Sequence, residues 1–125
     1  MFRSLSAALV LCASPALAND PIGFVGVEFH MNGLACASAV DARKLATVVL
    51  GEHVVLDRQI TNLIEAGKLS CSFSQQDVVY AGAVTGSTFT VNGLEYVIDQ
   101  LAPVESVDPV FVWRSVPPAK PPTEA

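Results

Sequence analysis

Residues 89–96 read Phe-Thr-Val-Asn-Gly-Leu-Glu-Tyr and predict a β-hairpin. Asn92-Gly93 lies between two β-rich runs and favours a two-residue type I′ turn, because both central residues of that turn need positive φ. One side of the hairpin is then apolar and aromatic and the other is polar, which is typical of a half-buried antiparallel sheet. The turn also fixes the register, and the predicted cross-strand pairs are Phe89–Tyr96, Thr90–Glu95 and Val91–Leu94.

Alternating apolar residues predict further strands on either side of the hairpin. The clearest is Leu-Ser-Cys-Ser-Phe-Ser at 69–74, where a period of two places Leu69, Cys71 and Phe73 on the core face. The other predicted strands are a first strand at 22–30, ended by Asn32-Gly33, an apolar run at 78–84 closed by Thr85-Gly86, and a final strand at 110–114 that carries Trp113.

Two segments between the first strands have helical periodicity. Ser38 followed by Asp41 has the capping-box spacing, and Gly51 stands where a residue following a helix is expected. A second, shorter helix is predicted from an N-cap at Asp57 to a stop at Gly67. The apolar faces consist of Ala39, Ala42, Leu45, Ala46 and Val49 in the first helix and of Ile60, Leu63 and Ile64 in the second.

These elements predict an α+β fold, with a small antiparallel sheet of about four or five strands and one or two helices packed on one face. Residues 19–115 form one domain, since a chain of this length has no room for a second. Residues 116–125 are Pro-rich and predict an extended tail that cannot pack.

The first eighteen residues have the pattern of a secretory signal peptide. Arg3 provides the positive start, a short apolar run follows, and Ala16-Leu17-Ala18 is an A-x-A cleavage signal. The apolar run is shorter than the roughly 20 residues that a membrane-spanning helix needs. We therefore expect a mature chain that starts at Asn19, is periplasmic or secreted, and has no membrane anchor.

The cysteines predict one disulfide. Cys12 belongs to the expected signal peptide, and Leu11 before it does not fit a lipidation motif. Cys36 and Cys71 remain, and an oxidising compartment favours a bridge between them. The competing hypothesis is a catalytic thiol working with one of the two histidines, and it is disfavoured because exported thiols tend to be oxidised.

The charge of the chain restricts its partners. Removing the signal peptide removes Arg3, so six basic and twelve acidic residues remain and the mature net charge is −6. An acidic surface repels phosphate backbones and anionic headgroups, so nucleic acid is not an expected partner. The same charge keeps an exported protein soluble.

The sequence contains no complete set of catalytic, cofactor-binding or metal-ligating residues. Glu28 and His30 would project from the same side of a strand, but a metal or acid–base site needs a third group, and nothing in the sequence brings His53 near them. A solvated strand face is the simpler interpretation. Residues 82–88 resemble a nucleotide-binding loop but lack its lysine and following helix, so they predict a turn.

Residues 84–103, Val-Thr-Gly-Ser-Thr-Phe-Thr-Val-Asn-Gly-Leu-Glu-Tyr-Val-Ile-Asp-Gln-Leu-Ala-Pro, resemble the opening strands of thermonuclease-like domains. The residues that stand at that family's charged catalytic positions are Ser87, Tyr96, Leu101 and Val104. The resemblance therefore implies no nuclease activity and carries no site residue.

Three hypotheses for function remain open at the level of sequence. The first is a non-catalytic exported module that binds a protein or a small ligand in the envelope or the extracellular space. The second is a small exported hydrolase whose site residues are scattered in the sequence. The third is an accessory protein of an envelope assembly. A deep polar pocket would favour the enzyme, and an exposed apolar patch would favour the binding module.

Overall fold

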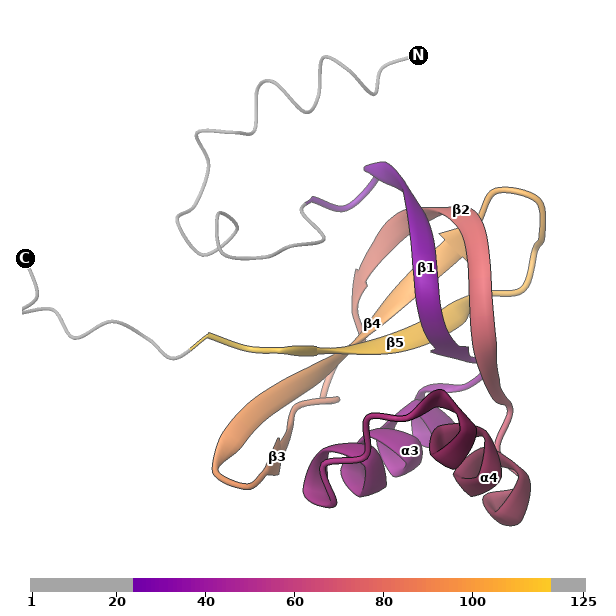
Figure 1. The fold of residues 1–125 in the computed structure, drawn as a ribbon. Helices are drawn as coiled ribbons and strands as arrows, with labels where there is room; N and C mark the ends of the chain where they lie inside the picture. The colour runs from indigo at the N-terminus through magenta and orange to yellow at the C-terminus, as the bar shows by residue number, and fades with distance from the viewer. Residues whose placement is uncertain (1–23, 118–125) are drawn as a thin grey trace, which may run out of the picture.

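The structure is a computed structural model that describes residues 24–117. The elements in chain order are β1 (Glu28–Cys36), α3 (Ala39–Gly51), α4 (Asp57–Gly67), β2 (Cys71–Ala83), β3 (Phe89–Val91), β4 (Leu94–Pro103) and β5 (Val110–Ser115) (Figure 1). All five strands pair antiparallel, and both helices lie on one side of the sheet. The predicted α+β class is confirmed, whereas residues 1–18 and most of 116–125 lie outside the described residues.

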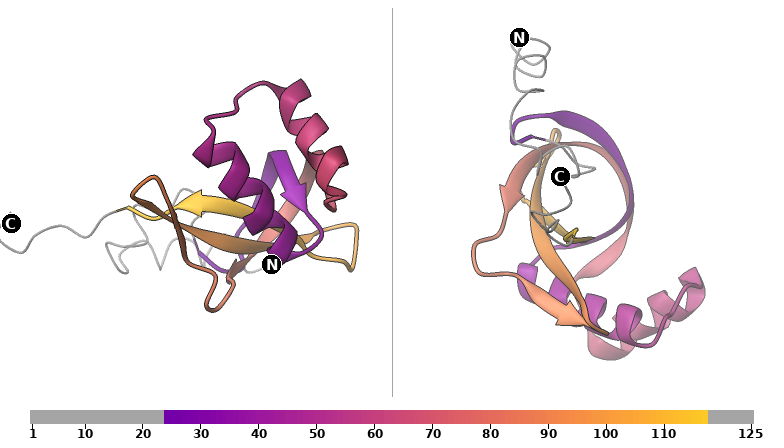
Figure 2. Two further views of the ribbon diagram at one scale, coloured as in Figure 1. Left: turned by 90° about the horizontal axis from the view of Figure 1, so that it is seen from below. Right: turned by 90° about the vertical axis from the view of Figure 1, so that its left-hand side faces the viewer.

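The sheet closes on itself. Its strand order is β2-β1-β5-β4-β3, and β2 also pairs with β4, so β1, β2, β4 and β5 surround a small barrel interior (Figure 2). A register shift between Tyr80 and Gly82 bends β2, and Gly82 has a φ of 109° that a residue with a side chain rarely adopts. The bend lets β2 pair with β1 along its first half and with β4 along its second.

The hairpin has the predicted register. Phe89 pairs with Tyr96, Thr90 with Glu95 and Val91 with Leu94. The φ angles of Asn92 and Gly93 are 52° and 82°, as the turn requires. The rings of Phe89 and Tyr96 stack with their centroids 5.6 Å apart.

The first strand differs from the prediction. It was expected at 22–30 with an end at Asn32-Gly33, but β1 begins at Glu28 and runs through that pair to Cys36. Gly33 pairs with Ser74 of β2, and the ladder continues on both sides of it. Hydrogen bonds to a neighbouring strand therefore outweigh the local preference of Asn-Gly for a turn.

The strand predictions at 69–74 and 78–84 are also corrected, because β2 is one strand of 13 residues that covers most of both. Cys71 is buried as expected, and Leu69 packs against the core from just outside the strand. Phe73, by contrast, is 45% exposed and not part of the core. A period of two identifies the face of a strand but not how far the helices cover it.

The first helix begins as predicted. The Ser38 hydroxyl accepts a hydrogen bond from the Asp41 backbone N–H at 3.1 Å. The second helix does not have the predicted cap: Asp57 is its first residue, and Leu56 occupies the N-cap position without a side-chain hydrogen bond. The Asp57 carboxylate still lies at the positive end of α4, where it is favourable.

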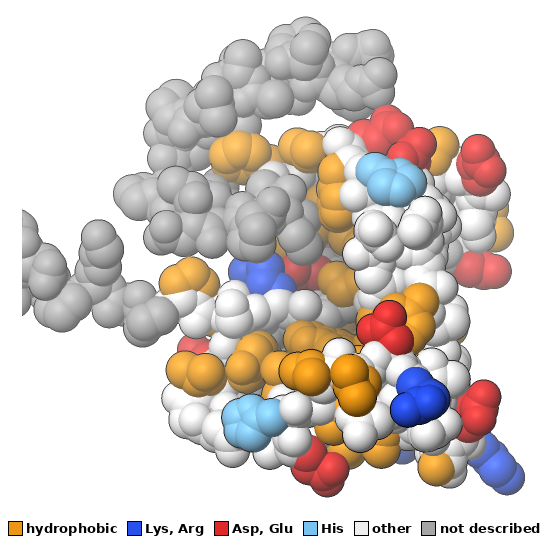
Figure 3. Space-filling view, viewed as in Figure 1, with side chains coloured by type: hydrophobic (Ala, Val, Ile, Leu, Met, Phe, Trp, Pro, Cys, Tyr) orange, Lys and Arg blue, Asp and Glu red, His pale blue; other side chains and the backbone are white. Residues whose placement is uncertain are grey.

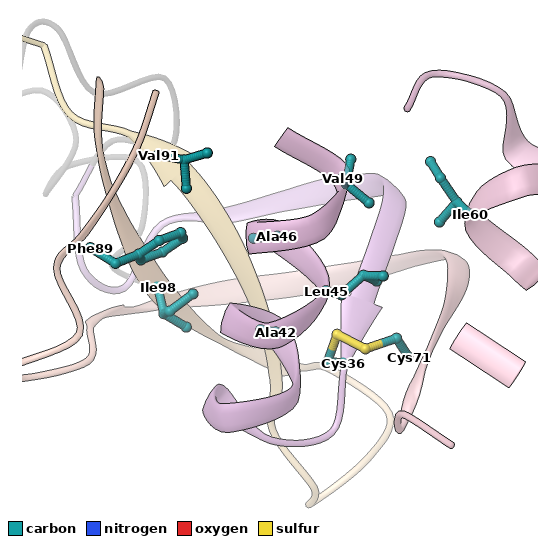
Figure 4. Close-up of a cluster of buried hydrophobic side chains, with 10 residues drawn as sticks. All are labelled: Cys36, Ala42, Leu45, Ala46, Val49, Ile60, Cys71, Phe89, Val91 and Ile98. Atoms are coloured by element: carbon teal, nitrogen blue, oxygen red, sulfur yellow. A yellow bond between two sulfur atoms is a disulfide. The ribbon is translucent and has the colours of Figure 1, made fainter. Parts of the chain in front are cut away.

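The main core lies between the helices and the outer face of the barrel (Figure 4). Ala42 and Ala46 are completely buried, and their small side chains let α3 approach the strands closely. Leu45 fills the space beside the disulfide (Figure 4). The other buried members are Val49 and Ile60 from the helices and Phe89, Val91 and Ile98 from the strands.

A second core fills the barrel interior. Because successive strand residues point to opposite faces, the strands that support the helices also supply this cluster. Its buried members are Met31, Ala35, Val78, Tyr80 and Leu101. The closed sheet therefore has two apolar faces, one inside the ring and one under the helices.

Candidate functional site

The structure joins Cys36 and Cys71 in a disulfide, as the sequence predicts. The two residues are directly opposite one another at the end of the β1–β2 ladder, next to the start of α3. Their exposed fractions are 1% and 8%, so this bridge is part of the core. Such a bridge is compatible with a small domain exported to an oxidising compartment.

Hydrogen bonds of Asp41 form a second link between α3 and the start of β2, near the disulfide. The Asp41 carboxylate accepts hydrogen bonds from the Ser70 backbone N–H at 2.9 Å and from the Ser70 hydroxyl at 2.7 Å. These two bonds, the backbone one first, hold the pKa of the Asp41 carboxyl below its ordinary value. Asp41 thus joins α3 to the start of β2, which is a different role from the reciprocal bond of a capping box.

His30 lies opposite Asp77 in the β1–β2 ladder, and its Nδ1 atom is 2.9 Å from Asp77 Oδ1. A carboxylate on Nδ1 fixes the orientation of an imidazole and leaves Nε2 available, as in general-base sites. Both side chains are about 60% exposed, however. The sequence did not indicate this pair, because residues 47 positions apart meet only through strand pairing.

The hollow beside His30 is polar and open. Its volume is about 240 Å³, and the lining residues are His30, Gln75, Gln76, Asp77 and Glu105. None of them is a serine, threonine or cysteine that could act as a nucleophile. Within residues 24–117 no three His, Cys, Asp or Glu side chains are placed to hold a metal ion.

His53 lies elsewhere. It follows α3 with a φ of 53° and lines two hollows that do not include His30. The turn predicted at 82–88 is confirmed at Thr85-Gly86 alone, because Gly82 and Ala83 pair with β4 as the last residues of β2. Ser87, which follows the turn, is buried, and its hydroxyl donates to the Val84 carbonyl at 2.7 Å and accepts from the Ile98 backbone N–H at 3.1 Å.

A buried ion pair inside the barrel was not indicated by the sequence. Asp99 is completely buried, and its carboxylate accepts hydrogen bonds from Arg114 Nε at 2.7 Å and from Arg114 Nη2 at 3.1 Å. The Tyr80 hydroxyl donates to the same carboxylate at 2.9 Å. Every buried side-chain polar atom of the described residues has a hydrogen-bond partner. The network satisfies a charge that would otherwise be costly to bury.

A mainly apolar concavity lies between the end of α3 and the β3–β4 hairpin. We call it the α3–hairpin groove; its volume is about 320 Å³, and its lining consists of Val49, Leu50, His53, Val54, Val55, Asn92, Leu94 and Tyr96. Val55 is 79% exposed and Leu94 is 59% exposed. Hydrophobic side chains gather in a row over this region in the space-filling view (Figure 3).

The groove is built by two features that the sequence does show. The Asn92-Gly93 turn places Leu94 at the start of β4, and the Asn92 side chain donates to the Leu50 carbonyl at 3.3 Å, which attaches the hairpin to the end of α3. Val54 and Val55, which follow His53, line the groove beside the same end of α3. The signal in the sequence was the short apolar piece at residues 54–56, between the two predicted helices.

Comparisons with protein-family models, with curated proteins and with solved structures find no match for this chain. No helix in residues 24–117 is long and apolar enough to cross a membrane.

Proposed function

We propose that this protein is an exported, non-catalytic module that binds a partner protein of the envelope or the extracellular space through the α3–hairpin groove. The observation that carries the proposal is the exposure of large apolar side chains, with Val55 and Leu94 at the margins of an apolar concavity. Binding energy in protein interfaces is concentrated where an apolar anchor fills such a concavity.

The size of the groove suits this role. Concavities that receive small ligands start at about 300 Å³, so this one accommodates one or two large side chains and not an extended cofactor. Burying one leucine-sized anchor contributes about 1.5–3 kcal/mol. A single anchor is therefore insufficient for a stable complex, and the partner must also contact the surrounding surface.

The disulfide and the predicted signal peptide support a location outside the cytoplasm. The Cys36–Cys71 bridge is compatible with an oxidising compartment. The mature protein used in any test should therefore start at Asn19 and have its disulfide formed. Mass spectrometry of the native protein checks that N-terminus, and recovery of the full-length chain would contradict the export assignment.

The test is site-specific photo-cross-linking in intact cells. Three single variants are made, each with one photoreactive residue, at position 55, at position 94 or at position 107. Position 107 is the matched control, because Val107 is 96% exposed but lies outside the groove. We expect one protein partner to be linked from positions 55 and 94 and not from 107. Leu94→Ser should abolish linkage from position 55. Equal linkage from all three positions, or linkage from 107 alone, would contradict the proposal.

The His30–Asp77 pair favours a second candidate, a small hydrolase that uses His30 to activate water. The lining of its hollow contains no nucleophilic side chain, and His30 and Asp77 are exposed, so it ranks below the binding module. Hydrolysis of an ester or amide substrate that is lost in His30→Gln and retained in His53→Gln would favour the enzyme.

A further inference from the structure

Resting on the proposed binding function, we infer that the partner segment carries a lysine or arginine next to its apolar anchor. The inference follows from the charges around the α3–hairpin groove, which are negative at the end of α3.

The helix itself contributes part of this charge. The C-terminus of an α-helix carries a partial negative charge of roughly half an elementary charge. The last turn of α3 contains no basic residue that would neutralise it. Val49 and Leu50 from this turn line the groove, so the C-terminal end of α3 lies beside the ligand position. The Val49 and Leu50 carbonyls accept hydrogen bonds from the Val54 backbone N–H and the Asn92 side chain, which leaves Glu52 as the main source of negative charge.

Glu52 adds a full negative charge at the same place. It lies immediately after α3 and lines a second hollow of about 400 Å³ that shares His53 and Val54 with the groove. The two hollows are therefore neighbours, with His53 and Val54 in the lining of both. Among residues 24–117, Glu52 is exposed and has no ion-pair partner.

The lining contains no side chain that is always positive, since His53 is the one basic group in it. Neither hollow includes a lysine or an arginine among its described lining residues. A segment with an acidic residue beside its anchor would meet Glu52 and the helix C-terminus, and like charges in such proximity are unfavourable. A basic residue at that position gains from both, and the net negative charge of the chain attracts it from a distance.

A peptide library provides the test. A phage-displayed library of random dodecapeptides is selected against the oxidised protein that starts at Asn19, and clones that also bind Leu94→Ser are removed. We expect the remaining peptides to contain a large apolar residue within two positions of a lysine or arginine. Their affinity should fall as the salt concentration rises, because the attraction is screened.

Two charge-reversal variants separate the site from the net charge. Glu52→Lys changes the charge beside the groove, whereas Glu95→Lys makes the same change on the opposite side of the hairpin, where Glu95 pairs with Thr90. We expect Glu52→Lys to weaken the selected peptides about tenfold and Glu95→Lys less than twofold.

The outcomes distinguish the inference from the proposed function. Peptides that need Leu94 but carry acidic residues or no charge, or an affinity unchanged in Glu52→Lys, overturn the inference and leave the binding groove in place. Failure to recover any peptide that needs Leu94 counts against the groove and so against both. Equal losses in the two charge reversals would show that net charge alone attracts the peptide, which also overturns the inference.

Discussion

Replacing Asp99 by asparagine tests the interior of the barrel. The substitution keeps the shape of the side chain and an oxygen that can accept from Tyr80, but it removes the charge that pairs with Arg114. The Arg114 side chain is 15% exposed, so its guanidinium would remain largely buried after losing the charge of Asp99. Removing one member of a buried ion pair typically costs about 3–5 kcal/mol.

That cost is large for this protein. Domains of this size unfold with free energies of about 5–15 kcal/mol, so the variant loses a large part of its stability. At about 4 °C or more per kcal/mol, the melting temperature should fall by at least about 12 °C. Urea unfolding followed by the fluorescence of Trp113, the one tryptophan in the sequence, measures the loss directly.

A double-mutant cycle supplies the control. Arg114→Met removes the second charge and retains an unbranched apolar side chain, so Asp99→Asn/Arg114→Met should be less destabilised than the sum of the two single variants by about 2 kcal/mol or more. Tyr80→Phe removes one hydrogen bond and should cost only about 1 kcal/mol. If Asp99→Asn costs less than about 1 kcal/mol, or if the single effects simply add, the Asp99–Arg114 pair does not stabilise the barrel.

Three further predictions follow from the other sites. Removing the disulfide with a Cys36→Ser/Cys71→Ser double variant should cost about 2–4 kcal/mol in urea unfolding, since the bridge closes a sequence separation of 35 residues; two free thiols in the native protein would contradict its role. A His30→Gln/His53→Gln double variant should have the same zinc content as the wild type by plasma mass spectrometry, because the histidines line separate hollows; stoichiometric zinc that disappears in the variant would refute this. Because the folded-state pKa of Asp41 is lowered, its stabilising effect is complete above its ordinary pKa near 4 and is lost as the pH falls through the lower value, so Asp41→Asn should be less stable than wild type at pH 7 and equally stable near pH 2 in urea unfolding.

Local patterns in the sequence determined most elements of this fold. The Asn92-Gly93 turn set the hairpin register because its backbone geometry depends on two adjacent residues. Ser38 set the start of α3 because its side chain caps a backbone N–H three residues away. The helical spacing of Ala42, Leu45, Ala46 and Val49 identified the buried face of that helix. The disulfide also followed from the sequence, because excluding the predicted signal peptide leaves two cysteines, which allow one pairing.

Tertiary structure decided what depends on residues far apart in the chain. β1 continues through Asn32-Gly33 because it pairs with β2 on both sides of these residues, and those hydrogen bonds outweigh the preference of Asn-Gly for a turn. Phe73 has the alternating position of a core residue in the sequence, but it is exposed because the helices do not cover that part of the strand.

The candidate sites also depend on tertiary contacts. His30 meets Asp77 through the pairing of β1 with β2, and Asp99 meets Arg114 through the pairing of β4 with β5. Leu94 meets the end of α3 because the β3–β4 hairpin packs against that helix. Each residue alone is an ordinary strand or loop residue in the sequence. The sequence determined which face of each element is apolar, whereas closure of the barrel decided which polar groups are buried together and which apolar side chains remain exposed.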